Sequence, residues 1–404
     1  MFATQRDPAG EAGPPLGLTE LGRVRVLHAL TEQSHISRSE IISRTGLARA
    51  TVSSIVVELI NAGLVRESEP AAVTGSRAGR PPQVLSLVPE SSYALGLDIA
   101  HDHVRAILTD IVGTVRWDDI LPMAVDRAPE RALEGAARLI NAALTDTGVP
   151  REKVLGLGAG IACLVDKDGR RLHAEEIMPG WVGVRPGDEL ADRTGLPVRI
   201  INDANAGVLA ERRWGAAVGC DNVVYLRLSS GIGAGIICDG RMLLGHRGIA
   251  GELGHIIVDP NGMLCRCGNR GCLETIASPP AIAELLARSW GRPVRSDDLA
   301  DLLRSGDRGT ARAIEDAGQA VGKALAIAVL VLNPEVIVVG GDLAAAQETL
   351  LGPMRRAISR NTMICHTDSP RIAVSALGDS AGVRGAAALV LQGAAEALTL
   401  APGN

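Results

Sequence analysis

The sequence predicts an α/β protein with a small N-terminal helical unit followed by a larger domain of two lobes. The chain has 404 residues, enough for two or three domains. Its first 90 residues contain three amphipathic helical stretches and then two short strands, and from residue 93 short apolar strands alternate with helical stretches. With 46% hydrophobic and 22% charged residues, the composition excludes a wholly disordered chain, a collagen-like repeat and a small disulfide scaffold.

The charge is unevenly divided along the chain. The formal net charge is −5, but the first 90 residues hold equal numbers of Arg and acidic residues and no Lys. The negative net charge of the chain argues against a protein that coats nucleic acid in general, but it leaves room for a small local DNA-binding unit. The N-terminal stretch has no apolar run typical of a secretory signal, so we expect a cytoplasmic protein with no membrane partner. Its cysteines should then be thiols or metal ligands rather than disulfides.

The first helices are predicted from their ends. Residues 1–17, rich in Gly and Pro, are expected to form a flexible tail, after which Thr19 is placed to cap a first helix. The run Ser37-Arg-Ser-Glu40 is a capping box, because the hydroxyl and the carboxylate can each accept from the other residue's backbone N–H. It predicts a short second helix ending at Gly46, which favours a left-handed C-cap.

A third helix is expected from about Ala48 to Ala62, with its apolar residues on one stripe. A short helix, a turn with Gly and a following helix are typical of a helix-turn-helix, although an ordinary three-helix unit gives the same periodicity. The strands Leu64–Arg66 and Val84–Val88 then enclose a loop with basic residues and indicate a winged helix. The predicted DNA contacts are small polar or basic residues off the stripe and the basic residues of the wing: Arg49, Thr51, Ser53, Ser54, Arg77 and Arg80.

The remaining chain is predicted to be α/β from its apolar runs. The expected strands are Ala94–Ala100, Val104–Ile111, Val154–Gly158, Val198–Ile201, Val223–Leu228 and Val336–Val339. Helical patterns fall between most of them, as in a two-lobed α/β domain.

Three cysteines lie within eight residues, in Cys265-Arg-Cys267-Gly-Asn-Arg-Gly-Cys272, and Gly251-Glu-Leu-Gly-His255 precedes them. Three thiolates and an imidazole form one of the donor sets of structural zinc. We therefore predict one structural zinc per chain, held by His255, Cys265, Cys267 and Cys272. The alternative is a loop with three reduced thiols and no metal.

These motifs resemble the ROK family of repressors, open reading frames and sugar kinases. The resemblance rests on the GELGH and CRCGNRGCLE segments, on Asn202-Asp-Ala-Asn-Ala206 upstream, and on the later Asn333–Gly341 and Gly382–Ala387 segments. The N-terminal helix-turn-helix is similar to the repressor branch, of the xylose-repressor and N-acetylglucosamine-repressor type.

The resemblance implies a winged helix-turn-helix followed by a two-lobed actin-like (ribonuclease H-like) domain. The expected divisions are a tail at 1–17, a DNA-binding domain at 18–90 and a sugar-sensing domain at 91–400. Within the last, one lobe would hold about 91–202 plus 385–400, and the other 203–384.

The resemblance also implies which residues bind a sugar between the lobes. They are Asn202, Asp203, Glu252, His255 and Glu274. Carboxylates and an amide suit a ring of hydroxyls, and His255 could bind zinc through one ring nitrogen and a hydroxyl through the other. Surface salt bridges are the alternative role for Glu252 and Glu274.

Family kinases use the aspartate at position 203 as a general base and need a phosphate cradle. Their first strand runs into an Asp-x-Gly-Gly-Thr-type turn, where this chain has Asp98-Ile-Ala-His101-Asp102. Larger side chains and a negative charge disfavour phosphate there, although the Gly-rich segment Ser229–Gly235 is kept. We therefore expect no catalytic residue unless the protein is a kinase, in which case the base is Asp203.

The motifs and the family resemblance together predict a sugar-responsive transcriptional regulator, acting as a repressor, rather than an enzyme. Its partners would be operator DNA with an inverted repeat, a sugar or sugar-phosphate effector, and further copies of itself in a homodimer or homotetramer. Closure of the lobes on the effector would reorient the DNA-binding domains through the linker Pro81–Pro89. One alternative is an ATP-dependent sugar kinase with an attached DNA-binding domain, and another is a regulator titrated by a protein partner rather than a sugar.

Overall fold

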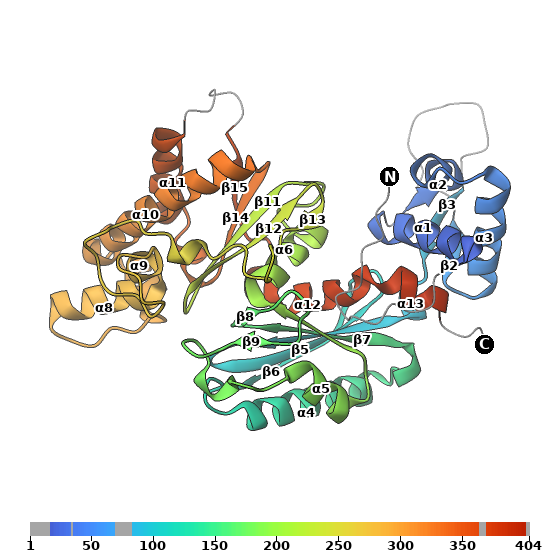
Figure 1. The fold of residues 1–404 in the computed structure, drawn as a ribbon, viewed down its shortest axis with the longest axis horizontal. Helices are drawn as coiled ribbons and strands as arrows, with labels where there is room; N and C mark the ends of the chain where they lie inside the picture. The colour runs from blue at the N-terminus through green and yellow to red at the C-terminus, as the bar shows by residue number, and fades with distance from the viewer. Residues whose placement is uncertain (1–16, 34, 69–82, 363–368, 401–404) are drawn as a thin grey trace.

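The computed structural model describes residues 17–33, 35–68, 83–362 and 369–400. The N-terminal domain has helices packed beside a small antiparallel sheet of order β1-β3-β2 (Figure 1). Its elements are α1 (Leu18–Glu32), β1 (Ile36–Ser37), α2 (Arg38–Thr45), α3 (Arg49–Asn61), β2 (Val65–Ser68) and β3 (Val84–Leu87). The wing strands pair in register from Val65 opposite Leu87 to Ser68 opposite Val84. Arg77 and Arg80, in the loop between them, lie outside the described residues.

Two predicted helix starts have different outcomes. The capping box at α2 is confirmed, because Ser37 Oγ accepts from Glu40 N at 3.3 Å and Glu40 Oε2 accepts from Ser37 N at 2.8 Å. The prediction that Thr19 caps the first helix is wrong: the N-cap is Gly17, two residues earlier, and Glu20 Oε2 accepts from Gly17 N at 2.6 Å. A Glu three residues into the helix satisfies the backbone without a capping hydroxyl.

The first lobe is a sheet of order β10-β7-β4-β5-β6, with α4 and α5 on its outer face (Figure 1). The strands β4 and β7 run parallel, as do β7 and β10, whereas β5 and β6 are added antiparallel. The bounds are β4 (Tyr93–Ile99), β5 (His103–Asp110), β6 (Val115–Pro122), α4 (Pro129–Thr147), β7 (Val154–Ile161), β8 (Leu164–Val165), β9 (Leu172–His173), α5 (Pro186–Thr194) and β10 (Val198–Asn202).

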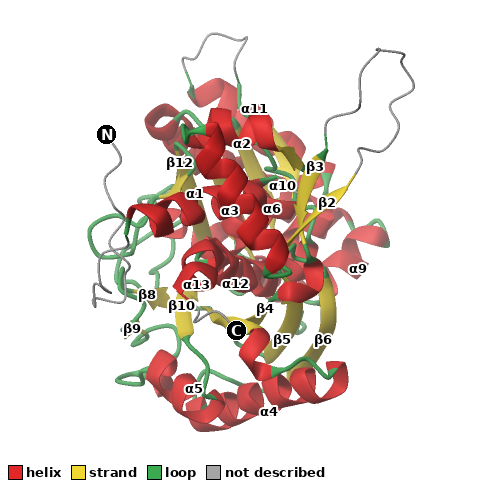
Figure 2. Cartoon of the chain, turned by 90° about the vertical axis from the view of Figure 1, so that its right-hand side faces the viewer, coloured by secondary structure: helices red, strands yellow, loops and turns green. Residues whose placement is uncertain are grey.

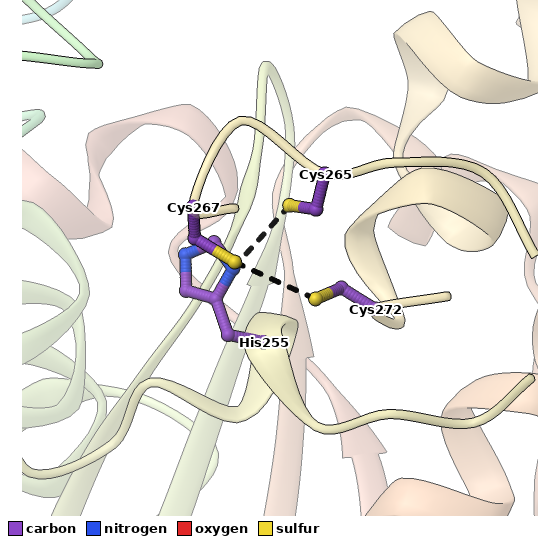
Figure 3. A group of neighbouring side chains, drawn as sticks. All are labelled: His255, Cys265, Cys267 and Cys272. Carbon is purple, nitrogen blue, oxygen red and sulfur yellow. Dashed lines mark hydrogen bonds between the residues drawn. The ribbon is translucent and has the colours of Figure 1, made fainter. Parts of the chain in front are cut away.

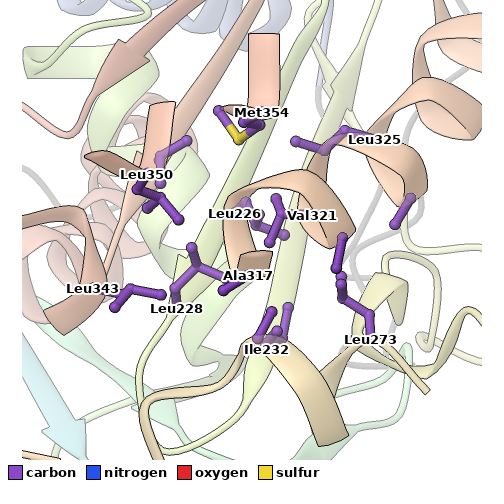
Figure 4. Packing of buried hydrophobic residues seen from close by; sticks show 14 of the residues in the cluster. Leu226, Leu228, Ile232, Leu273, Ala317, Val321, Leu325, Leu343, Leu350 and Met354 are labelled. Carbon is purple, nitrogen blue, oxygen red and sulfur yellow. The ribbon is translucent and has the colours of Figure 1, made fainter. Parts of the chain in front are cut away.

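The second lobe is a sheet of order β13-β12-β11-β14-β15. Its core lies between the strands and two long helices, where Leu226 and Leu228 pack with Val321, Leu350 and Met354 (Figure 4). The bounds are β11 (Val223–Leu228), β12 (Ile232–Cys238), β13 (Arg241–Met242), α7 (Glu274–Ala277), α8 (Pro279–Trp290), α9 (Asp298–Arg304), α10 (Arg308–Leu332), β14 (Val336–Gly340), α11 (Glu348–Asn361) and β15 (Arg371–Val374). The two sheets with their helices confirm the predicted α/β class.

Two helices join the lobes. Helix α6 (Asp203–Trp214) packs on β11 and β12 of the second sheet, and α12 (Ala381–Gln392) packs on β4 and β7 of the first. The two helices also pack on each other. Glycines make the close approach of α12 to the sheet possible: a Cβ at Gly96 would lie 2.2 Å from Val383 O, and a Cβ at Gly158 would lie 1.9 Å from Ala386 O.

The last helix, α13 (Ala394–Leu400), leaves the end of α12 and packs on α1 of the N-terminal domain (Figures 1 and 2). Buried residues of both belong to one hydrophobic cluster, in which Ala394 and Ala395 join Leu27 and Leu30. An ion pair adds to this contact, since His28 Nε2 lies 3.0 Å from Glu396 Oε1. The N-terminal domain is therefore joined to the rest of the molecule in two ways, by its linker into the first lobe and by the packing of α1 on α13.

Within the described residues, no helix combines the length and apolarity needed to cross a membrane.

Candidate ligand site and metal centre

A cavity lies where residues of both lobes meet. The sequence predicted five ligand-binding residues, and all five line this cavity: Asn202, Asp203, Glu252, His255 and Glu274. The cavity is also lined by His101, Arg227 and Arg266, so that two guanidinium groups face the carboxylates. The Gly-rich segment at the start of β12 forms another part of its wall.

Asn202 and Asp203 stand at the junction of β10 and α6. Asn202 Oδ1 caps the helix, accepting from Ala204 N at 3.0 Å and Asn205 N at 3.2 Å. Its amide nitrogen donates to Cys163 O at 3.1 Å and to Asp203 Oδ1 at 3.0 Å. The amide thus holds the helix start and orients Asp203, and its contact with a sugar hydroxyl stays a prediction.

Asp203 is held on both of its oxygens. Its Oδ1 accepts from Ala204 N at 2.8 Å in addition to the Asn202 amide, and its Oδ2 forms an ion pair with the guanidinium of Arg227. Arg227 comes from β11 and was not among the predicted site residues. The signal that could have found it is a lone charge in the otherwise apolar strand Val223–Leu228.

The other carboxylates come from the loops of the second lobe. Glu274 begins α7 and is 11% exposed; its Oε1 lies 2.8 Å from Arg266 Nη2, and its Oε2 accepts from Ile232 N at 3.1 Å. Burial, with repulsion from Asp203 and Glu274, raises the pKa of Glu252 to about 7, although Arg266 opposes the shift. Glu252 is thus the carboxylate with the weakest compensation, and a hydroxyl donor would stabilise its charged form.

His255 and the three cysteines form a compact group of metal-ligand atoms (Figure 3). Their donor atoms all lie within 4.8 Å of one another. Cys265 Sγ is 3.6 Å from His255 Nδ1, and Cys267 Sγ is 3.6 Å from Cys272 Sγ. A tetrahedral zinc with Zn–S bonds of about 2.3 Å would set its ligand atoms about 3.8 Å apart. The four side chains therefore fit a metal of this kind.

His255 lies between this metal group and the cavity. While its Nδ1 faces the sulfurs, its Nε2 is 3.9 Å from Glu252 Oε2. A metal on Nδ1 would fix the ring and leave Nε2 for the cavity. The same loop carries Glu274 two residues after Cys272.

The turn between β4 and β5 holds His101 and Asp102 in side-chain contacts. His101 Nδ1 is 2.7 Å from Asp126 Oδ1, and Asp102 Oδ1 is 2.7 Å from His103 Nδ1. These side chains occupy the turn that the family resemblance assigns to phosphate binding.

The predicted DNA contacts at the start of α3 lie at the surface. Arg49, Thr51 and Ser54 are exposed and Ser53 is partly exposed, while Val52 and Ile55 are buried in the core of the domain. Ser54 Oγ donates to Glu58 Oε1 at 3.4 Å. Their role in DNA binding stays a prediction.

Comparisons with known proteins match both parts of the chain. Residues 94–393 match the model of the ROK family, and residues 16–72 match the model of the MarR family. The chain is 29% identical over 375 residues to the xylose repressor of Bacillus subtilis (strain 168), covering 93% of this chain and 96% of the relative. Both expected parts of the fold, the winged helix and the actin-like domain, are thereby confirmed.

Solved structures of both a regulator and a kinase resemble this chain. A ROK family transcriptional regulator, described as a homolog of the E. coli MLC protein, has a TM-score of 0.78 and 29% identity, covering 95% of this chain and 98% of the regulator. A ROK family glucokinase from Streptomyces griseus in complex with glucose and AMPPNP has a TM-score of 0.65 and 28% identity, covering 75% of this chain and 100% of the kinase.

Proposed function

Because this chain belongs to the ROK family, we propose that it is a sugar-responsive transcriptional repressor. One observation carries the proposal: a single chain joins a winged helix to a cavity lined by three carboxylates, an amide and an imidazole. Similarity to a xylose repressor over nearly the whole of both chains supports this combination. We take 18–90 as the DNA-binding domain and 91–400 as the sensing domain, acting in the cytoplasm on operator DNA.

The start of α3 would read the major groove of the operator. Arg49 can donate to a guanine edge, and the hydroxyls of Thr51, Ser53 and Ser54 can contact bases or phosphates. Arg77 and Arg80 would reach the minor groove from the wing. The contacts proposed for α3 are supported by the exposure of its residues at the surface.

The effector would be a sugar or a sugar phosphate bound by Asn202, Asp203, Glu252, His255 and Glu274. Glu252 is the most informative of these residues, because burial disfavours its charge and few donors compensate it. A bound hydroxyl would supply the missing donor. Arg266, which lies against the Gly-rich segment, could pair with a phosphate group.

A structural zinc would be held by His255, Cys265, Cys267 and Cys272. When bound, it would crosslink the loop and neutralise its thiolates. Two residues of this loop connect the metal group to the cavity. His255 places Nε2 on the cavity side, and Glu274 accepts a hydrogen bond from the backbone N–H of Ile232.

The effector signal would pass through packed helices. Helix α6 begins at Asp203 in the cavity, α12 packs along α6, and α13 continues from α12 onto α1. Closure of the lobes would change this packing as well as the linker Pro81–Pro89. Coupling of about 1–3 kcal/mol would alter operator affinity about 5- to 150-fold.

We further propose that the repressor is a homodimer or homotetramer that reads an inverted repeat. Support comes from an apolar surface on α10, where Ile327 and Leu330 are exposed beside Ile257 around a hollow of about 320 Å³. Sedimentation velocity of Leu330→Asp should show a shift toward monomer relative to the parent.

The alternative function, a sugar kinase, is favoured by the glucokinase similarity and by the presence of Asp203. The side chains of His101 and Asp102 in the phosphate turn argue against it. An ATP-dependent phosphorylation assay over a sugar panel distinguishes the two, since a repressor without turnover forms no sugar phosphate.

The test of the proposed function begins with a thermal-shift screen of sugars and sugar phosphates, because a ligand of the folded state raises Tm. The stabilising compound is then added to a complex with operator DNA selected from a random pool. Glu252→Gln should lose the sugar response while keeping sugar-free DNA binding. Glu284→Gln, at an exposed position of α8, is the matched control and should respond like the parent. A parental response in Glu252→Gln would show that the cavity is not the sensor.

A further inference from the structure

The first lobe offers few uncommitted polar atoms to the cavity. Among the described residues, its polar lining side chains are His101, Cys163 and Asn202. The Asn202 amide has two acceptor and two donor positions, and all are filled, by two N–H groups of α6 and by Cys163 O and Asp203 Oδ1. The Cys163 thiol donates to His173 O at 3.2 Å, and burial raises its pKa to about 12, so that it stays protonated. A ligand could bind either group well only by displacing a partner.

His101 differs from both of these side chains. Its Nδ1 lies 2.7 Å from Asp126 Oδ1, and its Nε2 has no hydrogen-bond partner in the part of the chain that the structure describes. A carboxylate can only accept, so the nitrogen that faces it carries the hydrogen, and in the neutral ring Nε2 then keeps the lone pair. Because Asp126 engages Nδ1, Nε2 is the ring nitrogen left for the cavity that His101 lines.

Backbone hydrogen bonds hold this pair in place. Val125 N donates to His101 O at 3.0 Å, and Gly180 N donates to Asp126 O at 2.9 Å. Beside them Trp181 is fully buried, and its Nε1 donates to Val125 O at 3.0 Å. The carboxylate that orients the imidazole is thus fixed in a packed segment of the first lobe.

We propose that His101, oriented by Asp126, accepts a hydrogen bond at Nε2 from a hydroxyl of the bound ligand and supplies the first lobe's contact with it. The inference rests on the proposed function for the presence of a sugar in the cavity, and it deepens that function by a further binding residue. Asp126 is a positioning residue, since it acts through the imidazole. The second lobe contributes Glu252 and His255 to the same cavity, so a ligand that reaches His101 is held from both lobes.

The same geometry restricts the chemistry of the ligand. A lone pair on Nε2 attracts a group that carries a hydrogen, such as a sugar hydroxyl, and repels the oxygens of a phosphate, which are acceptors. A sugar phosphate can therefore place its phosphate group near Arg266 of the second lobe, but not beside His101. The end of the ligand that faces the first lobe should carry unmodified hydroxyl groups.

The first measurement needs no sugar. Nitrogen NMR of the full chain, isotope-labelled at histidine, distinguishes protonated from unprotonated ring nitrogens, and comparison with His101→Phe assigns the signals of His101. We expect a hydrogen on Nδ1 and a lone pair on Nε2 in the parent, and a mixture of both tautomers in Asp126→Ala. A hydrogen on Nε2 of the parent would overturn the proposal.

The second measurement is calorimetric titration of the variants with D-xylose, D-glucose and N-acetyl-D-glucosamine. For a sugar that binds the parent, His101→Phe should weaken binding about 3- to 10-fold, the effect of losing one hydrogen bond. His101→Gln keeps an acceptor oxygen near the position of Nε2 and should recover part of the loss. Asp126→Ala, which leaves residue 101 intact, should also weaken binding, so the test does not depend on the folding of His101→Phe.

His103 is the matched control in the same turn. Its side chain is 23% exposed, as is that of His101, and its Nδ1 also lies 2.7 Å from a carboxylate oxygen, that of Asp102. His103 is not among the described residues that line the cavity, so His103→Phe should bind sugar like the parent.

The outcomes separate this inference from the proposed function. Sugar binding by a folded His101→Phe as tight as by the parent, or an equal loss in His103→Phe, would overturn the role of His101 alone. If the parent binds none of the sugars, the result counts against the proposed function, while the tautomer measurement still decides for or against His101.

Discussion

The crossing of α6 and α12 offers a sharp test of how the cavity is connected to the rest of the molecule. At this crossing Gly385 of α12 lies against the backbone of Ala206 in α6, and a Cβ at Gly385 would stand 1.7 Å from Ala206 O. Real Cβ atoms essentially never approach closer than 3.0 Å, so Gly385→Ala requires one backbone to retreat by more than about 1 Å.

Neither helix has room for that retreat, since on the α6 side a Cβ at Gly235 of β12 would lie 2.3 Å from Ala204 O. Helix α12 already rests on β4 and β7 at Gly96 and Gly158, where a Cβ would lie 2.2 Å and 1.9 Å from α12 carbonyl oxygens. Overpacking of this kind costs about 1–3 kcal/mol and occasionally more. With both sides of the helix fixed, we expect about 3 kcal/mol, which lowers Tm by roughly 6 °C at about 2 °C per kcal/mol.

The control is Gly393→Ala at the C-terminal end of α12. Its Cβ would have ordinary contacts, with Arg199 Nη1 and Val390 O both at 3.6 Å, and its φ of −89° suits any residue. Because Gly393 is the C-cap of α12 with a φ that Ala can adopt, Ala there mainly restricts the unfolded chain, and the control should be neutral or slightly stabilising. Thermal unfolding followed by circular dichroism measures both variants. If Gly385→Ala melts at or above the temperature of the parent, the close crossing of α6 and α12 is wrong.

Three other predictions follow from the metal loop, the DNA-binding helix and the C-terminal helix. Cys267→Ser should reduce the bound zinc measured by elemental analysis, and it should lower both Tm and the sugar response. The control Cys220→Ser should change none of these three quantities. Equal zinc content in the two variants would contradict the proposed ligand set. Arg49→Ala should weaken specific operator binding by about 1–3 kcal/mol and reduce the base preference at one operator position, as measured by gel-shift titration over operator variants. An unchanged base preference would show that Arg49 is not in the DNA interface. His28→Ala should lower the free energy of unfolding by at most about 1 kcal/mol, since its partner Glu396 is 46% exposed. The same variant should nevertheless show a smaller effect of sugar on DNA binding. An unchanged effect of sugar would exclude the His28–Glu396 contact from the coupling.

Local patterns explain what the sequence could predict. The apolar run Val223–Leu228 coincides with β11, and the capping box at Ser37 starts α2. The cluster of potential metal ligands was predictable because three of its residues lie within eight positions and the fourth shortly precedes them. In each case the interacting residues are close in sequence, so spacing alone fixes their geometry.

Contacts between distant segments were not predictable in the same way. The pairing of Arg227 with Asp203 depends on two sheets meeting across α6, and the packing of α13 on α1 joins the two ends of the chain. Thr19 shows a local limit, because its hydroxyl predicts a helix start, whereas α1 begins at Leu18 and Glu20 Oε2 accepts from Gly17 N.

In the proposed repressor, binding of a sugar in the inter-lobe cavity changes the binding of operator DNA by the winged helix of the same chain. The most direct measurement is a fluorescence-anisotropy titration of selected operator DNA with the parent protein, in the presence and absence of the sugar that stabilises it. If the cavity and the winged helix are coupled, operator affinity should change about 5- to 150-fold on addition of that sugar. Sugar binding that raises Tm but leaves operator affinity unchanged would contradict it.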